Sequence, residues 1–217
     1  MKDILEKIMN EFINSDDHFC SEADFQFSLA WRIKEELKNV EIILEYPIEN
    51  KENTNQHIYI DICVIHNNKK HFIELKYKTK RVAFKKHDIP FKLTTQSAHD
   101  LGRYHFCKDI ERLEKMKNKG CHNYAIFLTN DPAYVSKPKH SETLDKNFRI
   151  HEGSELKKGI PLEWNTPKSN CNAEKPHWTS SYDTIEFNND YTCKWNTNEK
   201  ATKSYLLLKI KPNNNSN

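Results

Sequence analysis

Apolar residues recur every three or four positions in two stretches at the start of the chain. They fall on one side of a helix over residues 3–13 and again over residues 22–37. Ser21 lies three residues before Asp24, which is capping-box spacing and marks the start of the second stretch. The pattern therefore predicts two amphipathic helices ahead of any strand.

Four short runs rich in apolar and β-branched residues follow, and they predict strands at 40–48, 58–65, 71–77 and 123–130. Asn67 and Asn68 separate the second run from the third. Because Asn tolerates positive φ, this pair predicts a tight hairpin turn. A Lys- and His-rich loop and a helix from about residue 95 to 118, ending before Gly120, complete this part.

From residue 136 onward, short apolar pieces alternate with polar, Asn-rich connections, which predicts further strands. The order of helices and strands predicts an α/β sandwich around a mixed central sheet. We expect a core over residues 1–135 and a β-rich C-terminal extension over residues 136–217, packed on that core.

The composition is polar, with a mean hydropathy of −0.89, but 11% aromatic residues argue against disorder. No apolar stretch reaches membrane-spanning length, and the first residues lack the features of a signal peptide, so we expect a cytoplasmic protein. The six cysteines form no CxxC pair. A zinc site built from Cys171, His177 and Cys193 would match no common ligand spacing.

The net charge of +3 is a weak indication of an anionic partner, and one local feature strengthens it. Between residues 76 and 87, lysines and an arginine are interleaved with Tyr77 and Phe84. This mixture suits phosphate contacts combined with base stacking. On charge pattern alone, a solvated Lys-rich loop accounts for it equally well.

Three charged residues interrupt strands that are otherwise apolar: Asp61 in the second run, and Glu74 and Lys76 in the third. Glu74 and Lys76 project from the same face of their strand. A turn centred on Asn67 and Asn68 would set Asp61 opposite Glu74, at a Cβ separation of about 5 Å. Two carboxylates this close repel each other unless a cation or proton lies between them, so this pair predicts an Mg²⁺ or Mn²⁺ site.

An acid on one strand followed across a hairpin by E-x-K resembles the PD-(D/E)XK nuclease superfamily, through D61-x12-E74-L75-K76. The resemblance covers roughly residues 15–130 and implies a restriction-endonuclease-like α/β/α sandwich. It also implies Mg²⁺- or Mn²⁺-dependent endonuclease or exonuclease activity, on DNA rather than RNA, in restriction, phage defence or repair. No proline precedes Asp61, which departs from the family's motif.

The resemblance also implies further site residues. Glu22 on the preceding helix and the Leu75 carbonyl would join Asp61 and Glu74 as metal ligands, and Gln96 would join the catalytic set. Candidate nucleic-acid contacts are Lys78, Lys80, Arg81, Lys85, Lys86, Arg103 and Tyr104. Double-strand cleavage by one site per chain would favour a homodimer.

The charged residues in the strands also fit a structural role. E-x-K occurs four times in the chain, so the apolar context of Glu74 and Lys76 carries the weight. These charges could instead form a buried ion pair that holds the sheet together. Glu22 could be an ordinary first-turn acid. The chain could also be a catalytically inactive module that binds nucleic acid or a partner protein.

Overall fold

The computed structural model describes residues 1–16, 18–49, 57–86, 88–116, 122–166, 176–200 and 202–212. Helices α1 (Lys2–Asn14) and α2 (Glu22–Glu36) confirm the two predicted helices. The Ser21 hydroxyl accepts a hydrogen bond from the Asp24 backbone N–H and caps α2, as its spacing predicts.

The described residues form a six-stranded mixed sheet in the order β1-β2-β3-β6-β10-β9. Its strands are β1 (Glu41–Glu49), β2 (His57–His66), β3 (Lys69–Lys78), β6 (Asn123–Thr129), β9 (Trp195–Asn198) and β10 (Lys203–Ile210). β3 and β6 run parallel, joined through helix α3 (His99–Lys115), and the other neighbouring strands are antiparallel. The predicted mixed α/β architecture is confirmed at this level.

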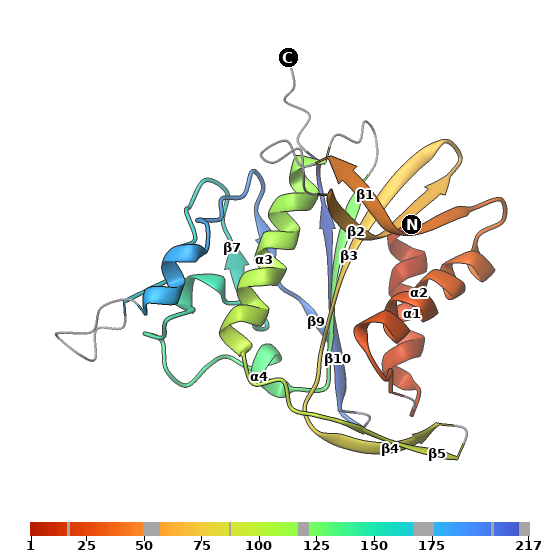
Figure 1. Ribbon diagram of the computed structural model, residues 1–217, viewed down its shortest axis with the longest axis horizontal. Coiled ribbons are helices and arrows are strands. Elements are labelled where there is room, and N and C mark those ends of the chain that lie inside the picture. Colours follow the sequence, from red (N-terminus) through yellow and green to blue (C-terminus); the bar gives the residue numbers. More distant parts are fainter. Residues whose placement is uncertain are drawn as a thin grey trace.

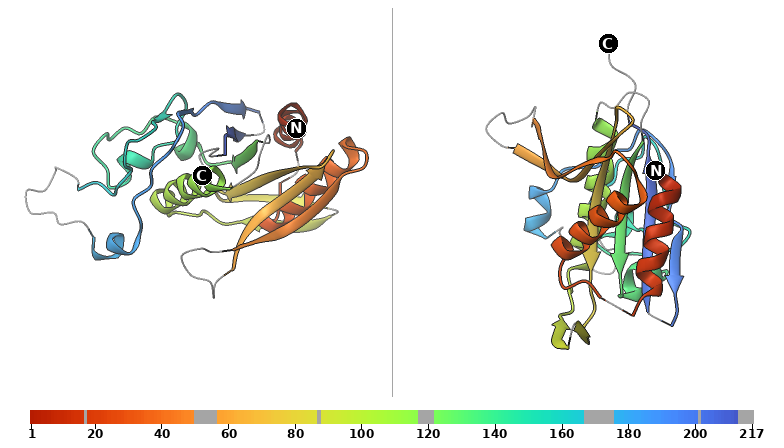
Figure 2. Two further views of the ribbon diagram at one scale, coloured as in Figure 1. Left: turned by 90° about the horizontal axis from the view of Figure 1, so that it is seen from above. Right: turned by 90° about the vertical axis from the view of Figure 1, so that its right-hand side faces the viewer.

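Helices cover both faces of the sheet. Figure 1 shows α1 and α2 on one side and α3 on the other, and the side view in Figure 2 agrees. Two apolar cores result. One holds residues of α1 and α2 with Ile62, Ile73 and Leu75; the other holds residues of α3 with Cys63 and Phe72. Side-chain alternation along β2 and β3 therefore feeds both cores.

The β2–β3 hairpin has the predicted turn. Asn67 and Asn68 both have positive φ, 50° and 59°, and His66 pairs with Lys69. The antiparallel ladder runs from that pair as far as Ile62 opposite Ile73. The register inferred from the sequence is correct over this length.

The prediction of a loop after residue 78 is wrong. This segment forms a second hairpin, β4 (Val82–Lys86) and β5 (Ile89–Leu93), which projects beyond the main sheet in Figure 1. Phe84 and Phe91 stack across this hairpin with ring centroids 5.6 Å apart. The high density of lysines concealed the alternation of inward and outward residues.

The C-terminal third is not a uniform β-rich layer. β9 and β10 belong to the central sheet, so the boundary predicted at residue 135 does not separate the sheet from an extension. The segment between β6 and β9 is mostly irregular over its described residues, 130–166 and 176–194, and these pack on the outer side of α3 (Figures 1 and 2). Its elements are α4 (Pro132–Val135), the short 3-10 helices Lys146–Phe148 and His177–Ser181, β7 (Glu155–Leu156) and β8 (Tyr191–Thr192).

Because this segment covers it, α3 is buried on several sides. It begins at His99, four residues later than predicted, and Gln96 precedes it. The predicted stop at Gly120 lies outside the described residues. Within the described ranges, no helix is both long and apolar enough to cross a membrane.

Candidate active site

The regular pairing of β2 with its neighbours changes at Asp61. The β2–β3 ladder stops at Ile62, and Glu45 on β1 has φ of 49° between two regular pairs of the β1–β2 ladder. The Gln26 side-chain amide of α2 donates to the Asp61 carbonyl at 2.6 Å and to the Glu45 carboxylate at 2.6 Å. Helix α2 therefore holds the backbone of β2 at the point where it leaves β3.

Side chains take the place of β2 along the open edge of β3. The backbone N–H groups of Leu75 and Tyr77 donate to the Asp61 carboxylate at 2.6 Å and the Glu22 carboxylate at 2.7 Å. The Thr79 N–H donates to the Gln96 side-chain oxygen at 3.3 Å. Three of the predicted site residues thus satisfy alternate N–H groups of one strand edge, which would otherwise be unpaired.

This row explains why Glu22 does not meet the other two acids. Alternate residues of a strand are about 6.6 Å apart. The Asp61 and Glu22 carboxylates, which accept from the N–H groups of Leu75 and Tyr77, are therefore held at well-separated points. No group of three or more His, Cys, Asp or Glu side chains is arranged to hold a metal within the described residues. Glu22 instead positions β3 against α2.

Gln96 has a comparable positioning role. Its backbone N–H donates to the Thr79 carbonyl at 2.9 Å, and the Thr79 hydroxyl donates to the Thr94 carbonyl at 2.9 Å. Together with the amide contact, these bonds close the base of the β4–β5 hairpin. Gln96 therefore lies in the segment before α3, whereas the sequence had suggested a place on the helix itself.

Glu74 and Lys76 face α3, and each meets an opposite charge from it. The Arg112 guanidinium donates to Glu74 Oε1 through Nε at 2.8 Å and lies 2.7 Å from it through Nη2. Lys76 Nζ lies 2.8 Å from Asp109 Oδ2, and Arg112 also binds Asp109 at 2.7 Å. We call Asp61, Glu74, Lys76, Asp109 and Arg112 the Glu74 cluster.

The electrostatics of the Glu74 cluster favour added positive charge. Burial raises the pKa of Glu74 well above its usual value, the charges of Asp109 and Asp61 raise it further, and Arg112 opposes them. Burial also raises the pKa of Asp61, although the Leu75 N–H, Lys76 and a hydrogen bond with Glu74 act in the opposite direction. The buried Glu74 carboxyl and the half-buried Asp61 carboxyl therefore lie within hydrogen-bonding reach of each other.

The charge balance points the same way. Glu22, Asp61, Glu74 and Asp109 interact with Lys76 or Arg112, so four carboxylates face two cations. Lys76 remains protonated, because Asp109 and the other acids raise its pKa to about 12 despite burial. If every carboxylate were ionised, the Glu74 cluster itself would carry one excess negative charge, and Glu22 beside it would add a second.

The residues present fit a divalent metal ion. Asp61 and Glu74 supply carboxylate oxygens that are close together, and the Leu75 carbonyl, which accepts from Lys76 Nζ at 3.2 Å, supplies a third oxygen on the same strand. Oxygen ligands of this kind suit Mg²⁺ or Mn²⁺. Two carboxylates leave room for water and a substrate oxygen, as in sites that keep several waters on Mg²⁺.

The predicted basic residues lie along β3 and the β4–β5 hairpin. Lys80, Arg81 and Lys85 are exposed, whereas Lys78 and Lys86 are half-buried. Lys86 pairs with Asp24 of α2 at 3.1 Å, which ties the hairpin to the core. Lys85 lies on the opposite side of β4 from Phe84, as does Lys92 of β5 relative to Phe91. The outward side of the hairpin is therefore basic.

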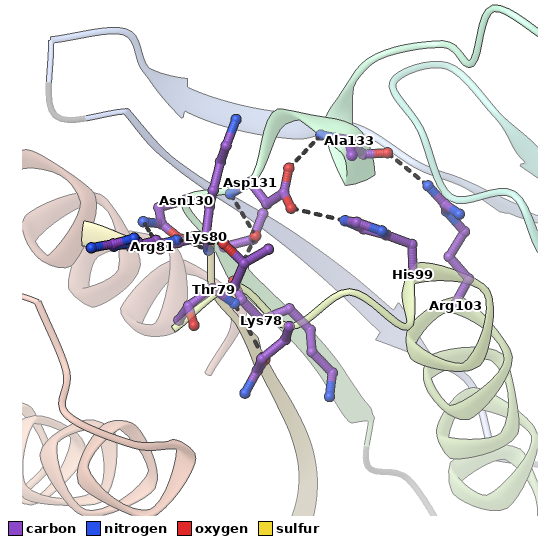
Figure 3. A network of polar contacts seen from close by, with 12 residues as sticks. Lys78, Thr79, Lys80, Arg81, His99, Arg103, Asn130, Asp131 and Ala133 are labelled. Carbon is purple, nitrogen blue, oxygen red and sulfur yellow. Dashed lines mark hydrogen bonds and ion pairs between the residues drawn. The ribbon is translucent and has the colours of Figure 1, made fainter. Parts of the chain in front are cut away.

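Arg103 and Tyr104 are not on this surface, and the expectation that they contact nucleic acid is corrected. Arg103 is 8% exposed and donates to Asp145 at 2.6 Å and to the Ala133 carbonyl at 2.7 Å. Figure 3 shows the latter contact beside the His99–Asp131 pair. Tyr104 is 4% exposed and stacks on Trp164. The C-terminal segment covers both residues, which the sequence pattern of α3 could not reveal.

Two members of the Glu74 cluster were missed in the sequence. Asp109 and Arg112 lie three residues apart on α3, and they carry the charges opposite to Lys76 and Glu74. Charge complementarity between the E-x-K strand and the following helix is the signal that could have identified them. Of the conceivable zinc ligands, Cys171 lies outside the described residues, and Cys193 is fully buried.

A scan against protein-family models and searches of curated proteins and of solved structures found no match for this chain.

Proposed function

We propose that the chain is a metal-dependent nuclease of the PD-(D/E)XK kind that hydrolyses phosphodiester bonds in DNA. The main support is the pair formed by half-buried Asp61 and buried Glu74, with raised pKa values and an excess of negative charge around them. The mixed sheet with helices on both faces agrees with the restriction-endonuclease-like α/β/α sandwich that the resemblance implies.

In this proposal, Asp61, Glu74 and the Leu75 carbonyl would hold one Mg²⁺ or Mn²⁺ ion. When bound, the ion supplies Lewis-acid polarisation of the phosphodiester and a lowered pKa for the attacking water. Lys76 donates a hydrogen bond to the phosphate oxygens and stabilises the negative charge that develops on them in the transition state. Glu22 and Gln26 act as positioning residues, since they fix the backbones of β3 and β2 at the site.

Basic residues, some exposed and some half-buried, continue along the chain from this site. Lys78 and Lys80 follow Lys76 at alternate positions, and the chain then enters the basic hairpin. We propose that these residues, with Arg81, Lys85 and Lys86, contact the phosphate backbone of the bound strand. Such contacts add affinity without sequence preference.

One observation favours a second candidate, a module with a nuclease-like fold that binds without cleaving. Glu74 and Lys76 each already have an ion-pair partner on α3, as a purely structural network would. The excess of carboxylates distinguishes the two candidates. A network that only stabilises the fold has no need of a hydrogen-bonded pair of acids beside it.

The test is cleavage of labelled single- and double-stranded DNA and RNA in Mg²⁺, Mn²⁺ or EDTA. We expect metal-dependent cleavage of DNA that is abolished by Asp61→Ala, Glu74→Ala and Lys76→Ala, each with an unchanged circular dichroism spectrum. Cleavage at the wild-type rate by Glu74→Ala would exclude the proposed site. Binding of DNA without cleavage under every condition would favour the second candidate.

A further inference from the structure

Arg112 is bound to the carboxylate that the proposed metal site needs. Its Nε and Nη2 atoms both approach Glu74 Oε1, at 2.8 and 2.7 Å. Glu74 itself is only 2% exposed, so its charge has little access to water. A guanidinium that makes two close contacts to one buried oxygen is a strong, directional counter-ion.

A guanidinium and a divalent metal ion both bind the lone pairs of a carboxylate oxygen, so they compete for Glu74. Glu74 Oε1 accepts the Arg112 Nε–H and has Nη2 beside it at 2.7 Å, so an ion bound to this oxygen would have to displace the guanidinium from it. Arg112 cannot make way by losing its proton, because arginine stays charged in proteins. It has to move or share the carboxylate.

The structure offers Arg112 a second anchor. Its Nη2 already lies 2.7 Å from Asp109 Oδ1, one turn earlier on the same helix. The side chain is 27% exposed, so its end can turn toward solvent while it keeps this contact. Release from Glu74 therefore leaves neither the guanidinium nor Asp109 without a partner.

We propose that Arg112 is the resident counter-ion of Glu74 and is displaced from it when a divalent metal binds. The inference rests on the proposed function, since it takes Glu74 as a metal ligand. Arg112 then sets the metal concentration at which the site fills. It is a positioning residue in this role, acting through Glu74.

The test compares metal affinities of the full chain. Mn²⁺ binding is followed by electron paramagnetic resonance for the wild type, Arg112→Gln and Lys108→Gln. Lys108 is a matched control, because it lies one turn earlier on α3 and pairs with Glu111 and Asp183.

We expect Arg112→Gln to bind Mn²⁺ about 10-fold or more tightly than the wild type, the range expected for losing a charged hydrogen bond. Lys108→Gln should stay within about 2-fold, because Lys108 pairs with Glu111 and Asp183 rather than with the proposed metal ligands.

A second readout does not depend on the folding of any variant. In the wild type, the Arg112 Nε–H nuclear magnetic resonance signal should shift on addition of Mg²⁺, because its acceptor changes. The signals of Arg103, whose acceptors lie elsewhere, serve as internal controls.

The outcomes separate the two proposals. Metal binding at Asp61 and Glu74 with an unmoved Arg112 signal and equal affinities would overturn only the role of Arg112. Absence of metal binding in both the wild type and Arg112→Gln would overturn the metal site and this inference together. Binding by Arg112→Gln at metal concentrations too low to fill the wild-type site would support displacement.

Discussion

Helix α3 carries two arginines, nine residues apart, that each pair with a buried carboxylate, with opposite electrostatic consequences. Arg103 binds Asp145 at 2.6 Å, and Asp145 also receives a hydrogen bond from Thr143. Burial alone would raise the pKa of Asp145, but Thr143 and the charges of Arg103 and Arg149 lower it overall. Arg112 binds Glu74 just as closely, yet the pKa of Glu74 is raised well above normal.

The difference lies in what surrounds each pair. Asp145 meets two arginines and a hydroxyl, so its ionised form is fully compensated. Glu74 shares its arginine with Asp109 and lies against Asp61, so negative charge is in excess. An ion pair whose carboxylate charge is fully compensated (a saturated pair) stabilises a fold. A pair with negative charge in excess (an unsaturated pair) is suited to bind a cation. Proximity of arginine to a carboxylate does not by itself distinguish the two cases.

The largest expected contrast is in catalysis. Glu74→Gln should lower metal-dependent cleavage by about 100-fold or more, comparable with losing one preorganised electrostatic group. Asp145→Asn should leave cleavage per folded molecule within about 3-fold, because it alters packing away from the site and acts mainly on stability. Initial rates, normalised to the folded fraction from circular dichroism, measure both. Equal losses in the two variants would remove the functional distinction.

The second contrast is in stability. Arg103→Met should lower the free energy of unfolding by about 3–5 kcal/mol, because it leaves Asp145 buried with less compensation. Urea denaturation measures the change. Mn²⁺ affinity measured below the unfolding transition should stay at the wild-type value. A weakened metal affinity in this variant would mean that the two pairs are coupled.

The third contrast is in pH dependence, and its sign differs between the pairs. The folded protein holds protons on Glu74 above its usual pKa of 4.5, so stability falls as pH rises through the raised value. The lowered pKa of Asp145 has the opposite effect. Its contribution is present above the usual value of 3.8 and is lost as pH falls through the lower folded value.

Urea denaturation at a series of pH values tests this assignment. Glu74→Gln should flatten the decline of stability above pH 4.5, and Asp145→Asn should flatten the loss in acid instead. Metal affinity should rise over the range in which Asp61 and Glu74 lose their protons. A decline that persists unchanged in Glu74→Gln would show that another group causes it.

The smallest expected effect concerns the basic hairpin. Lys85→Gln should weaken DNA binding by a few-fold and reduce the dependence of log K on log salt by about 1. Lys2→Gln, an exposed lysine that pairs with Glu6 on α1, is the control and should change neither. Fluorescence anisotropy at several salt concentrations gives both quantities. An unchanged slope for Lys85→Gln would indicate that this face of the hairpin is only solvated.

Local patterns were sufficient to predict the hairpin that carries the site. The Asn67–Asn68 turn fixes the β2–β3 register as far as Ile62 opposite Ile73. The predicted pairing of Asp61 with Glu74 is not part of that ladder, but the Asp61 side chain turns to the Leu75 N–H and interacts with Glu74. The interruption of apolar strands by charge was also informative, since burial makes such residues costly without a partner. Strand period and turn chemistry depend on neighbours in the sequence, which explains their success.

Features that depend on distant segments could not be predicted. Arg103 and Tyr104 looked like a polar face because nothing in α3 indicates that residues within 144–164 and 182–187 cover it. Glu22 begins α2, as its helix pattern predicted, but its partner, the Tyr77 N–H, is available to it only because β2 departs from β3. Asp109 and Arg112 carried a readable signal, their complementarity to Lys76 and Glu74.

The most direct test of the central claim is Mn²⁺ binding followed by electron paramagnetic resonance for the wild type, Asp61→Asn, Glu74→Gln and Asp145→Asn. If the unsaturated carboxyl pair is a metal site, the wild type and Asp145→Asn will bind one equivalent with similar affinity. Asp61→Asn and Glu74→Gln will lose that binding. Equal binding by all four proteins, or by none of them, would contradict the account.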